Sequence, residues 1–384
     1  MNTNAQTMTA SRKHDLAKLE TLLHEDHIAW NFGHMDHILP KRDIHAPSEK
    51  FRFSEEEQDL GIIRYNYGGQ TSTVQQYMDK VHATGWLVIK DDTIVTERYY
   101  SGYGPQSTAM SMSVAKSIVS LLMGIAFDEG AMENVLDPVT RYLPELAGSG
   151  YDGASIKDVL QMSSGVRFNE DYADPDAEIY TFLQDVFGET AMPITQFVRK
   201  LTRLQPPGHF QYKSVDTQVL CMLLERATGK KPSAYLEEKL WQPLGMEYDA
   251  YWNTDLHGNE IAFTFVNAAL RDYAKIGRLV LHQGTWNGRR IVSERWMNES
   301  VIPDRDGLKA GQADDFFGYQ YQWWTPRGSD GSEVMARGIY GQHIYVNRQE
   351  NAVIVKTGVD PTVFNVHDDE AVTAYRAILA HLKN

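Results

Sequence analysis

The sequence is poor in cysteine, in long apolar runs and in basic residues. Cys221 is the only cysteine among 384 residues, so the chain cannot form a disulfide within itself. It lies in the apolar run 219–224, and we expect a buried, unreactive thiol there. The longest apolar runs end well short of the ~20 residues that a membrane-spanning helix needs. We therefore expect no membrane span.

The excess of acidic residues limits the kinds of partner that the chain can have. There are 51 Asp and Glu against 37 Lys and Arg, a formal net charge of −14. No basic cluster offsets this charge, so neither nucleic acid nor an anionic membrane surface is an expected partner. Hydrophobic residues make up 42% and charged residues 23%, as in an ordinary soluble globular protein. The first 20 residues lack the basic start and apolar core of a signal peptide, so we expect a cytoplasmic protein.

Strand-like runs near both ends of the chain bracket a mostly helical middle. Residues 85–90 and 93–100 predict a hairpin around Asp91 and Asp92. Helices are expected over 113–127 with Gly130 as the stop, over 215–226 with Gly229 as the cap, and over 271–281. The last third predicts strands over 319–325, 333–340, 342–347 and 352–356, and then a closing helix with Val372, Tyr375, Leu379 and Leu382 at core spacing.

This order of elements predicts an α/β fold of the α+β kind. One antiparallel sheet, built from distant segments and flanked by helices, would carry an inserted, mainly helical lobe. We expect the sheet lobe at about 83–112 and 315–384, the helical lobe at about 113–314, and the active site in the crevice between them. Residues 1–80 would form an N-terminal accessory segment before a catalytic domain of residues 81–384.

Two histidine pairs stand out in the accessory segment, His24 with His27 and His34 with His37. Histidines at this spacing can share a helix face and bind zinc. A glycine and a proline interrupt the region, and the first pair has one intervening residue too few for the His-Glu-x-x-His pattern of metalloproteases. We interpret the pairs as packing or surface residues, and expect no metal and no cofactor.

The stretch 111–117 places a serine three residues before a lysine, at the start of the apolar run 118–127. On a helix, positions i and i+3 share a face, so the Ser113 hydroxyl and the Lys116 amine can come within hydrogen-bonding reach. The first is a latent nucleophile and the second a latent base. A helix cap followed by an ordinary lysine would give the same pattern, so a catalytic reading needs further partners.

Such partners lie in residues 207–214, which contain Tyr212 and Ser214. Together with Ser113 and Lys116, this segment resembles the Tyr-x-Asn element of the serine β-lactamase and penicillin-binding-protein superfamily, in the branch of class C β-lactamases, family VIII esterases and D-alanyl-D-alanine peptidases. Ser214 stands where Asn is usual, which keeps a hydrogen-bonding side chain but removes an amide. Residues 159–165 and 270–278 resemble two more elements in the same order. The resemblance covers about residues 83–360 and implies a β-lactamase-like fold.

Within the superfamily, residues 142–153 and 169–175 are similar to those of 6-aminohexanoate-dimer hydrolases, which cleave the amide of a short linear oligomer. This similarity implies that Tyr172 lines the substrate cleft and hydrogen-bonds near the scissile amide. The alternative is a tyrosine that only packs beside a proline-ended loop.

The third motif of the superfamily, Lys-Thr-Gly or His-Thr-Gly, lies on the strand that borders the cleft, and two more strands follow it. The literal triplet Lys356-Thr357-Gly358 would end the second of those later strands, so we interpret it as a chance match. The matching position is 336–339, where Arg337 replaces the hydroxyl residue and no Lys or His precedes it. Because the family's cation helps hold a substrate carboxylate, its loss bears on substrate choice.

The same match implies the remaining site residues. The backbone N–H groups of Ser113 and Ile339 would form the oxyanion hole, and the loss of one such donor typically costs on the order of 100-fold in rate. Gly338 would border the substrate together with Tyr172 and Ser214.

We therefore predict a serine hydrolase that cleaves small amides or esters through an acyl-enzyme on Ser113. Tyr212, held near Lys116, would take the serine proton, return it to the leaving group and activate the deacylating water. A free tyrosine has a pKa of about 10 and a free lysine about 10.4, so which of the two is the base stays open.

Two other functions compete with this prediction. A β-lactamase or D-alanyl-D-alanine peptidase is disfavoured because those substrates lie outside the cytoplasm. A non-catalytic binding module is kept open by Ser214 and Arg337. The expected partner is a small amide or ester. A homodimer is the candidate assembly, and neither the assembly nor the physiological substrate follows from the sequence.

Overall fold

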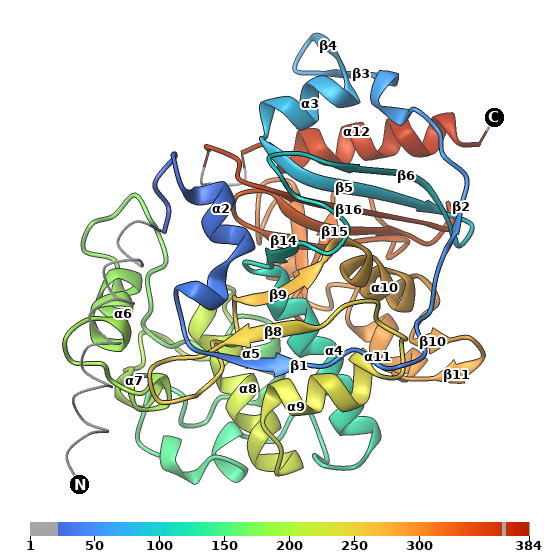
Figure 1. Ribbon diagram of the computed structural model, residues 1–384. Coiled ribbons are helices and arrows are strands. Elements are labelled where there is room, and N and C mark those ends of the chain that lie inside the picture. Colours follow the sequence, from blue (N-terminus) through green and yellow to red (C-terminus); the bar gives the residue numbers. More distant parts are fainter. Residues whose placement is uncertain (1–21, 363–365, 384) are drawn as a thin grey trace, which may run out of the picture.

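The computed structural model describes residues 22–362 and 366–383, and its largest element is an eight-stranded sheet (Figure 1). The strand order is β12-β13-β14-β15-β16-β5-β6-β2, and neighbouring strands are antiparallel except for β2 and β6. The strands are β12 (Phe317–Gln320), β13 (Trp323–Pro326), β14 (Glu333–Gly338), β15 (Gln342–Asn347), β16 (Ala352–Gly358), β5 (Ala83–Lys90), β6 (Thr93–Tyr99) and β2 (Ser54–Glu55). The predicted antiparallel sheet from distant segments is confirmed.

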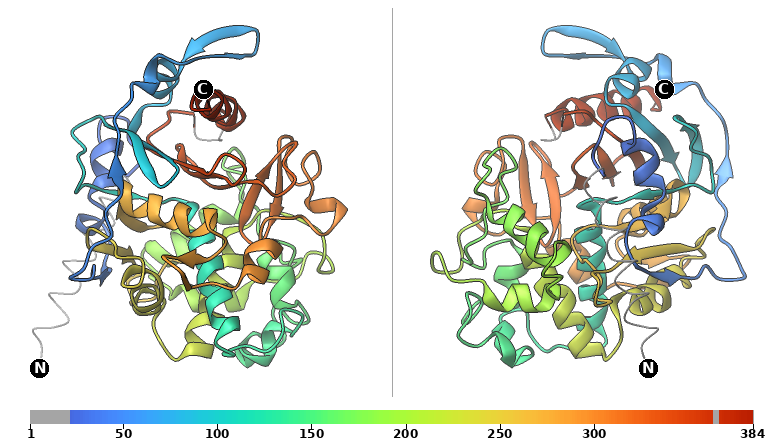
Figure 2. Two further views of the ribbon diagram at one scale, coloured as in Figure 1. Left: turned by 90° about the vertical axis from the view of Figure 1, so that its right-hand side faces the viewer. Right: turned by 60° about the vertical axis from the view of Figure 1, so that its left-hand side comes forward.

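Side chains alternate along the central strands and fill two separate cores. In β5, Leu87 and Ile89 belong to one core, whereas Trp86 and Val88 belong to the other. The first core contains α4 (Val114–Asp128) and α10 (Leu270–Leu281), and the second contains α3 (Val74–Lys80) and α12 (Asp368–His381). Figures 1 and 2 show α12 on one side of the sheet and α10 on the other. Burial on both faces explains the continuous apolar runs 86–89 in β5 and 352–355 in β16.

The helical part packs around α4. It consists of α5 (Ile156–Leu160), α6 (Glu178–Phe187), α7 (Ile194–Lys200), α8 (Ser214–Thr228), α9 (Pro232–Leu236) with the π-helical turn Glu237–Trp241, and α11 (Glu294–Glu299). Short 3-10 turns occur at Met35–His37, Leu60–Ile62, Val139–Arg141, Pro144–Leu146 and Asp306–Leu308. The helices predicted to begin near Ser113, Val215 and Arg271 and the closing helix are confirmed, and Gly130 and Gly229 follow α4 and α8 with φ of 74° and 69°.

A second, four-stranded sheet has the order β1-β8-β9-β7 and was not predicted. Its strands are β1 (Lys41–Ile44), β8 (Ala250–Asn253), β9 (Val266–Ala269) and β7 (Thr108–Met110). β7 ends three residues before Ser113, so this sheet sets the direction in which the chain enters α4. The elements that remain are α2 (Ile28–Gly33) and the hairpins β3 (Arg64–Tyr67) with β4 (Gln70–Thr73) and β10 (Thr285–Trp286) with β11 (Arg289–Arg290).

The described part of the N-terminal segment supplies strands to both sheets. β1 pairs with β8, and β2 pairs with β6. The domain boundary at residue 80 and the division into two lobes stay predictions. Within the described residues, no three His, Cys, Asp or Glu side chains gather into a group that could hold a metal ion. Among the same residues, no helix combines the length and the apolar character needed to cross a membrane.

Two turns of the large sheet differ in whether the sequence predicts them. Asp91 and Asp92 both have positive φ, 50° and 60°, and form the predicted hairpin turn between β5 and β6. The prediction of one strand over 319–325 is wrong, because Tyr321 and Gln322 turn the chain with φ of 39° and 69°. Tertiary hydrogen bonds support this turn: the Gln322 amide donates to the Leu160 carbonyl (2.9 Å), and the Ser117 hydroxyl donates to the Gln322 carbonyl (2.6 Å).

The contact of α10 with the large sheet leads to a stability prediction. A Cβ placed on Gly277 would lie 2.4 Å from Val353 Cγ1 and 3.0 Å from Ile344 Cγ2. Gly277→Val should therefore lower the free energy of unfolding by about 1–3 kcal/mol through overpacking, measured by chemical denaturation. Gly104→Val is the control, because a Cβ at Gly104 meets nothing within 4 Å. Equal stability of the two variants would contradict the tight packing of α10.

Candidate active site

Ser113 lies at the N-terminal end of α4, directly after a strained residue. Met112 has φ of 44°, a conformation that few residues other than glycine adopt. The Ser113 side chain makes no capping hydrogen bond to α4. Instead, Lys116 Nζ donates a hydrogen bond of 2.7 Å to Ser113 Oγ. The serine is therefore paired with the lysine and does not act as an ordinary helix cap.

Lys116 is buried in a largely neutral environment. Its side chain is 2% exposed, and Nζ also donates to the Phe263 carbonyl at 3.2 Å. Nζ lies 4.9 Å from the centroid of the Tyr212 ring. Burial lowers the pKa of Lys116 to about 8, although the Glu170 carboxylate acts in the opposite direction. A neutral amine is thus accessible near neutral pH.

Tyr212 stands in the loop before α8, against Tyr319 and Trp324. The centroid of the Tyr212 ring lies 6.1 Å from that of the Tyr319 ring and 5.4 Å from that of the Trp324 ring. Burial and the Glu170 carboxylate raise the pKa of Tyr212 well above its usual value, and the Ser113 hydroxyl and Arg337 oppose that rise. Tyr212 is therefore a protonated phenol at neutral pH.

Residues 159–165, which resembled a family element, support this loop. The Gln211 N–H donates to the Met162 carbonyl at 2.9 Å, and the Gly208 N–H donates to the Ser163 carbonyl at 2.8 Å. The two segments together fix the course of the backbone that carries Tyr212.

β14 passes very close to the nucleophile. A Cβ at Gly338 would lie 2.9 Å from the backbone nitrogen of Ser113 and 2.9 Å from the Ser111 carbonyl oxygen. Only a glycine allows this approach. Ile339, the predicted second oxyanion donor, follows directly at the end of the strand. The structure therefore brings the segment 338–339 beside Ser113, as the sequence match implied.

Arg337 does not take the place of the family's missing cation. Its Nε donates to Asp368 Oδ2 at 2.6 Å, and its guanidinium lies 3.9 Å from the Phe317 ring centroid and 4.5 Å from that of Trp324. The side chain is buried and its charge is matched by a carboxylate of α12.

The literal triplet Lys356-Thr357-Gly358 lies on β16, which β15 separates from β14. Lys356 Nζ donates to the Gly341 carbonyl at 2.7 Å and is buried. The triplet therefore ends the second strand after β14, as the sequence predicted, and its interpretation as a chance match stays a prediction.

Tyr172 and Ser214 meet at Glu170, a residue to which the sequence analysis gave no role. Glu170 Oε1 accepts from the Ser214 hydroxyl at 2.6 Å and from the Tyr172 hydroxyl at 3.3 Å. Its Oε2 accepts from the Ser214 backbone N–H at 2.5 Å. A possible signal was the acidic residue two positions before Tyr172, together with the serine in place of the family's asparagine.

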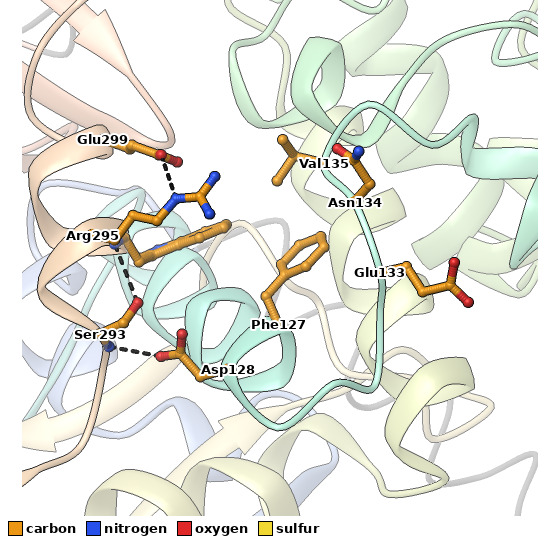
Figure 3. A pocket seen from close by; sticks show the side chains of 9 residues that line it. Phe127, Asp128, Glu133, Asn134, Val135, Ser293, Arg295 and Glu299 are labelled. Carbon is orange, nitrogen blue, oxygen red and sulfur yellow. Dashed lines mark hydrogen bonds and ion pairs between the residues drawn. The ribbon is translucent and has the colours of Figure 1, made fainter.

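A hollow at the opposite end of α4 is separate from this centre (Figure 3). The cavity has a volume of about 270 Å³ and is lined by Phe127, Asp128, Arg295 and Glu299, among others. Figure 3 shows Arg295 bonded to Glu299 and the Ser293 backbone bonded to Asp128. At 1.5 Å per residue, the length of α4 puts about 20 Å between this hollow and Ser113.

Comparison with known proteins agrees with this geometry. The sequence pattern of the Beta-lactamase family matches residues 71–376. The 6-aminohexanoate-dimer hydrolase of Paenarthrobacter ureafaciens is 31% identical over 348 residues, which cover 86% of this chain and 85% of that protein.

Solved structures share the fold. A Bacillus anthracis protein, provisionally named 6-aminohexanoate-dimer hydrolase, matches with a TM-score of 0.85 at 24% identity and covers 94% of this chain and 96% of its own. The hydrolase EstCE1, which has promiscuous acyltransferase activity, matches with a TM-score of 0.62 at 14% identity over 79% of this chain and 96% of its own. The chain thus belongs to the Beta-lactamase family and is a serine hydrolase with a β-lactamase-like fold.

Proposed function

We propose that this protein hydrolyses small linear amides, of which a 6-aminohexanoate dimer is the model, through an acyl-enzyme on Ser113. The hydrogen bond of 2.7 Å between Lys116 Nζ and Ser113 Oγ carries the proposal, because it pairs a nucleophile with a base of lowered pKa. The relative from Paenarthrobacter ureafaciens supports the choice of an amide substrate. Small esters are more reactive and should be accepted as well.

In the acylation step, Ser113 Oγ attacks the carbonyl carbon and its proton passes to the neutral Lys116 amine. The negative charge that develops on the carbonyl oxygen is stabilised by the backbone N–H groups of Ser113 and Ile339. Tyr212, a protonated phenol, donates its proton to the leaving amine and is reprotonated by Lys116. The C–N bond breaks, and the acyl group remains as an ester on Ser113.

In deacylation, water attacks the ester while Lys116 accepts its proton. As the bond between the acyl carbon and Ser113 Oγ breaks, Lys116 returns that proton to Oγ, and the acid product leaves. This assignment gives the first proton transfer to Lys116 and not to Tyr212. The reason is electrostatic: burial favours the neutral form of both groups, which is the basic form of a lysine and the acidic form of a tyrosine.

The residues of β14 favour linear amides over β-lactams as substrates. Ala336 occupies the place of the family's cation, and the neighbouring Arg337 is bound to Asp368. Neither residue offers a charge to the carboxylate that a β-lactam carries beside its scissile amide, whereas the carboxylate of a 6-aminohexanoate dimer lies at the far end of an alkyl chain from the scissile amide. Tyr172, Ser214 and Gly338 are the proposed substrate-side residues, while the cytoplasmic location and the homodimer stay predictions.

A fluorophosphonate probe tests the nucleophile. It should label the wild-type protein and leave Ser113→Ala unlabelled. Ser120→Ala is the matched control, since Ser120 is a buried serine of the same helix, and it should label normally. Equal labelling of wild type and Ser113→Ala would refute the serine mechanism. Turnover of a 6-aminohexanoate dimer should exceed that of nitrocefin, and the reverse order would identify a β-lactamase.

The pH dependence of kcat/KM should follow the protonation state of Lys116. Since the mechanism needs the neutral amine, kcat/KM for a neutral ester should fall about tenfold per pH unit below a midpoint of about 8. Lys116→Met should remove this limb along with most of the activity. Lys356→Met is the control, because burial lowers the pKa of Lys356 to about 8 as well, yet this lysine lies on β16 and donates to the Gly341 carbonyl instead of to Ser113. A limb that vanished only in Lys356→Met would overturn the assignment.

The role of Tyr212 should depend on the leaving group. Tyr212→Phe removes the proton that an amine leaving group requires, so amide turnover should fall by roughly 100-fold or more. Turnover of p-nitrophenyl butyrate should fall much less, because p-nitrophenolate leaves without a proton. Tyr319→Phe, which alters a buried neighbouring ring, should affect neither substrate strongly. Equal losses for ester and amide in Tyr212→Phe would rule out its role as an acid.

A further inference from the structure

Glu170 joins two segments of the active site that are distant in the sequence. It precedes Tyr172 in the loop before α6, and it binds Ser214 at the start of α8. Its two carboxylate oxygens accept separately from the Ser214 hydroxyl (2.6 Å) and the Ser214 backbone N–H (2.5 Å). A carboxylate held at two points in this way has a fixed orientation.

The Ser214 N–H is a donor that α8 cannot satisfy by itself. Ser214 is the first residue of the helix, and the preceding Lys213 makes no side-chain cap. The first N–H groups of a helix lack partners within the helix, and the helix dipole favours a negative charge beside them. Glu170 therefore serves as the cap of α8 and anchors the segment that carries Tyr212, two residues earlier.

The same carboxylate also binds Tyr172. The Tyr172 hydroxyl donates to Glu170 Oε1 at 3.3 Å, and the Tyr180 hydroxyl of α6 donates to the Tyr172 carbonyl at 2.7 Å. One acidic side chain thus binds both Tyr172 and the first residue of α8, two residues after Tyr212. We propose that Glu170 is a positioning residue that holds Tyr212 and Tyr172 in register with Ser113 and supplies the negative charge of the cleft. This inference rests on the proposed function.

The electrostatics of the site agree with this role. The negative charge of Glu170 acts to raise the pKa values of Tyr212 and Tyr172. At Lys116 it acts in the same direction, against the larger lowering by burial. The other groups that face Lys116 are neutral: the Ser113 hydroxyl, the Phe263 carbonyl and the Tyr212 ring. Arg337 acts on Tyr212 in the opposite direction, and Tyr340 adds to the rise at Tyr172.

Another carboxylate of the same loop region provides a matched control. Glu178 Oε2 accepts from the Asn169 backbone N–H at 2.8 Å, so it also binds a backbone donor. It is not among the charges that shift the pKa of Lys116 or Tyr212. Loss of its charge should therefore leave the chemistry unchanged.

The experiment compares the pH profiles of kcat/KM for p-nitrophenyl butyrate, together with fluorophosphonate labelling rates, in wild type, Glu170→Gln, Glu170→Asp, Ser214→Ala and Glu178→Gln. Glu170→Gln should lower the high-pH plateau by roughly tenfold or more, as expected for a displaced catalytic group. Its acid limb should move to lower pH, because loss of the negative charge favours the neutral amine of Lys116. Ser214→Ala keeps the charge and should lower the plateau without moving the limb, and Glu178→Gln should match wild type.

Two results would overturn the inference. One is a Glu170→Gln profile that coincides with that of Glu178→Gln. The other is a lowered plateau with an unmoved limb, which would reduce Glu170 to a structural cap. If Glu170→Gln does not fold, Glu170→Asp decides: it retains the charge but not the reach, so a wild-type plateau in that variant would also overturn the inference. Failure of the proposed function would look different, since wild type itself would then resist the fluorophosphonate probe.

Discussion

A desolvated lysine beside a serine hydroxyl is the interaction on which this site depends. Lys116 Nζ has two direct hydrogen-bond partners, the Ser113 hydroxyl and the Phe263 carbonyl, and neither carries a charge. Burial without a directly bonded carboxylate is what makes the amine a base instead of a permanent cation. A carboxylate in direct contact would restore the ammonium form, whereas the Glu170 carboxylate is hydrogen-bonded to Ser214 and Tyr172. The chemistry therefore depends on keeping the anion close but out of contact.

The fold supplies this geometry through backbone and not through side chains alone. β7, a strand of the four-stranded sheet, leads to the strained Met112. The turn at Met112 places Ser113 at the N-terminal end of α4. From the other side, Gly338 lets β14 approach the same turn so closely that any Cβ would clash. The strain at Met112 and the missing side chain at Gly338 both fit the proposed oxyanion hole, which needs the N–H groups of Ser113 and Ile339 near one point.

The sequence predicted those parts of the fold in which local pattern and tertiary structure agree. α4, α8 and α12 follow from apolar periodicity, α4 and α8 also from their glycine stops, and Asp91-Asp92 tolerates the left-handed turn that its hairpin needs. The turn at Tyr321–Gln322 could not be predicted, because its support comes from Ser117 and Leu160, far away in the sequence. Glu170 was missed for a similar reason: its role exists only where the Tyr172 loop meets the first residue of α8.

The ion pair between Arg337 and Asp368 links the catalytic strand to a helix that is synthesised late. Arg337 is the residue before Gly338, and Asp368 is the first residue of α12, the last helix in the chain. While the ribosome is still making α12, Arg337 lacks the Asp368 carboxylate and has only that of Asp314, whose Oδ2 lies 3.6 Å from its Nη1. Burial of the guanidinium without its nearer carboxylate would disfavour the folded arrangement. A nascent chain would therefore contain Ser113 and Lys116 long before the strand that leads to the proposed oxyanion donor Ile339 has its full support.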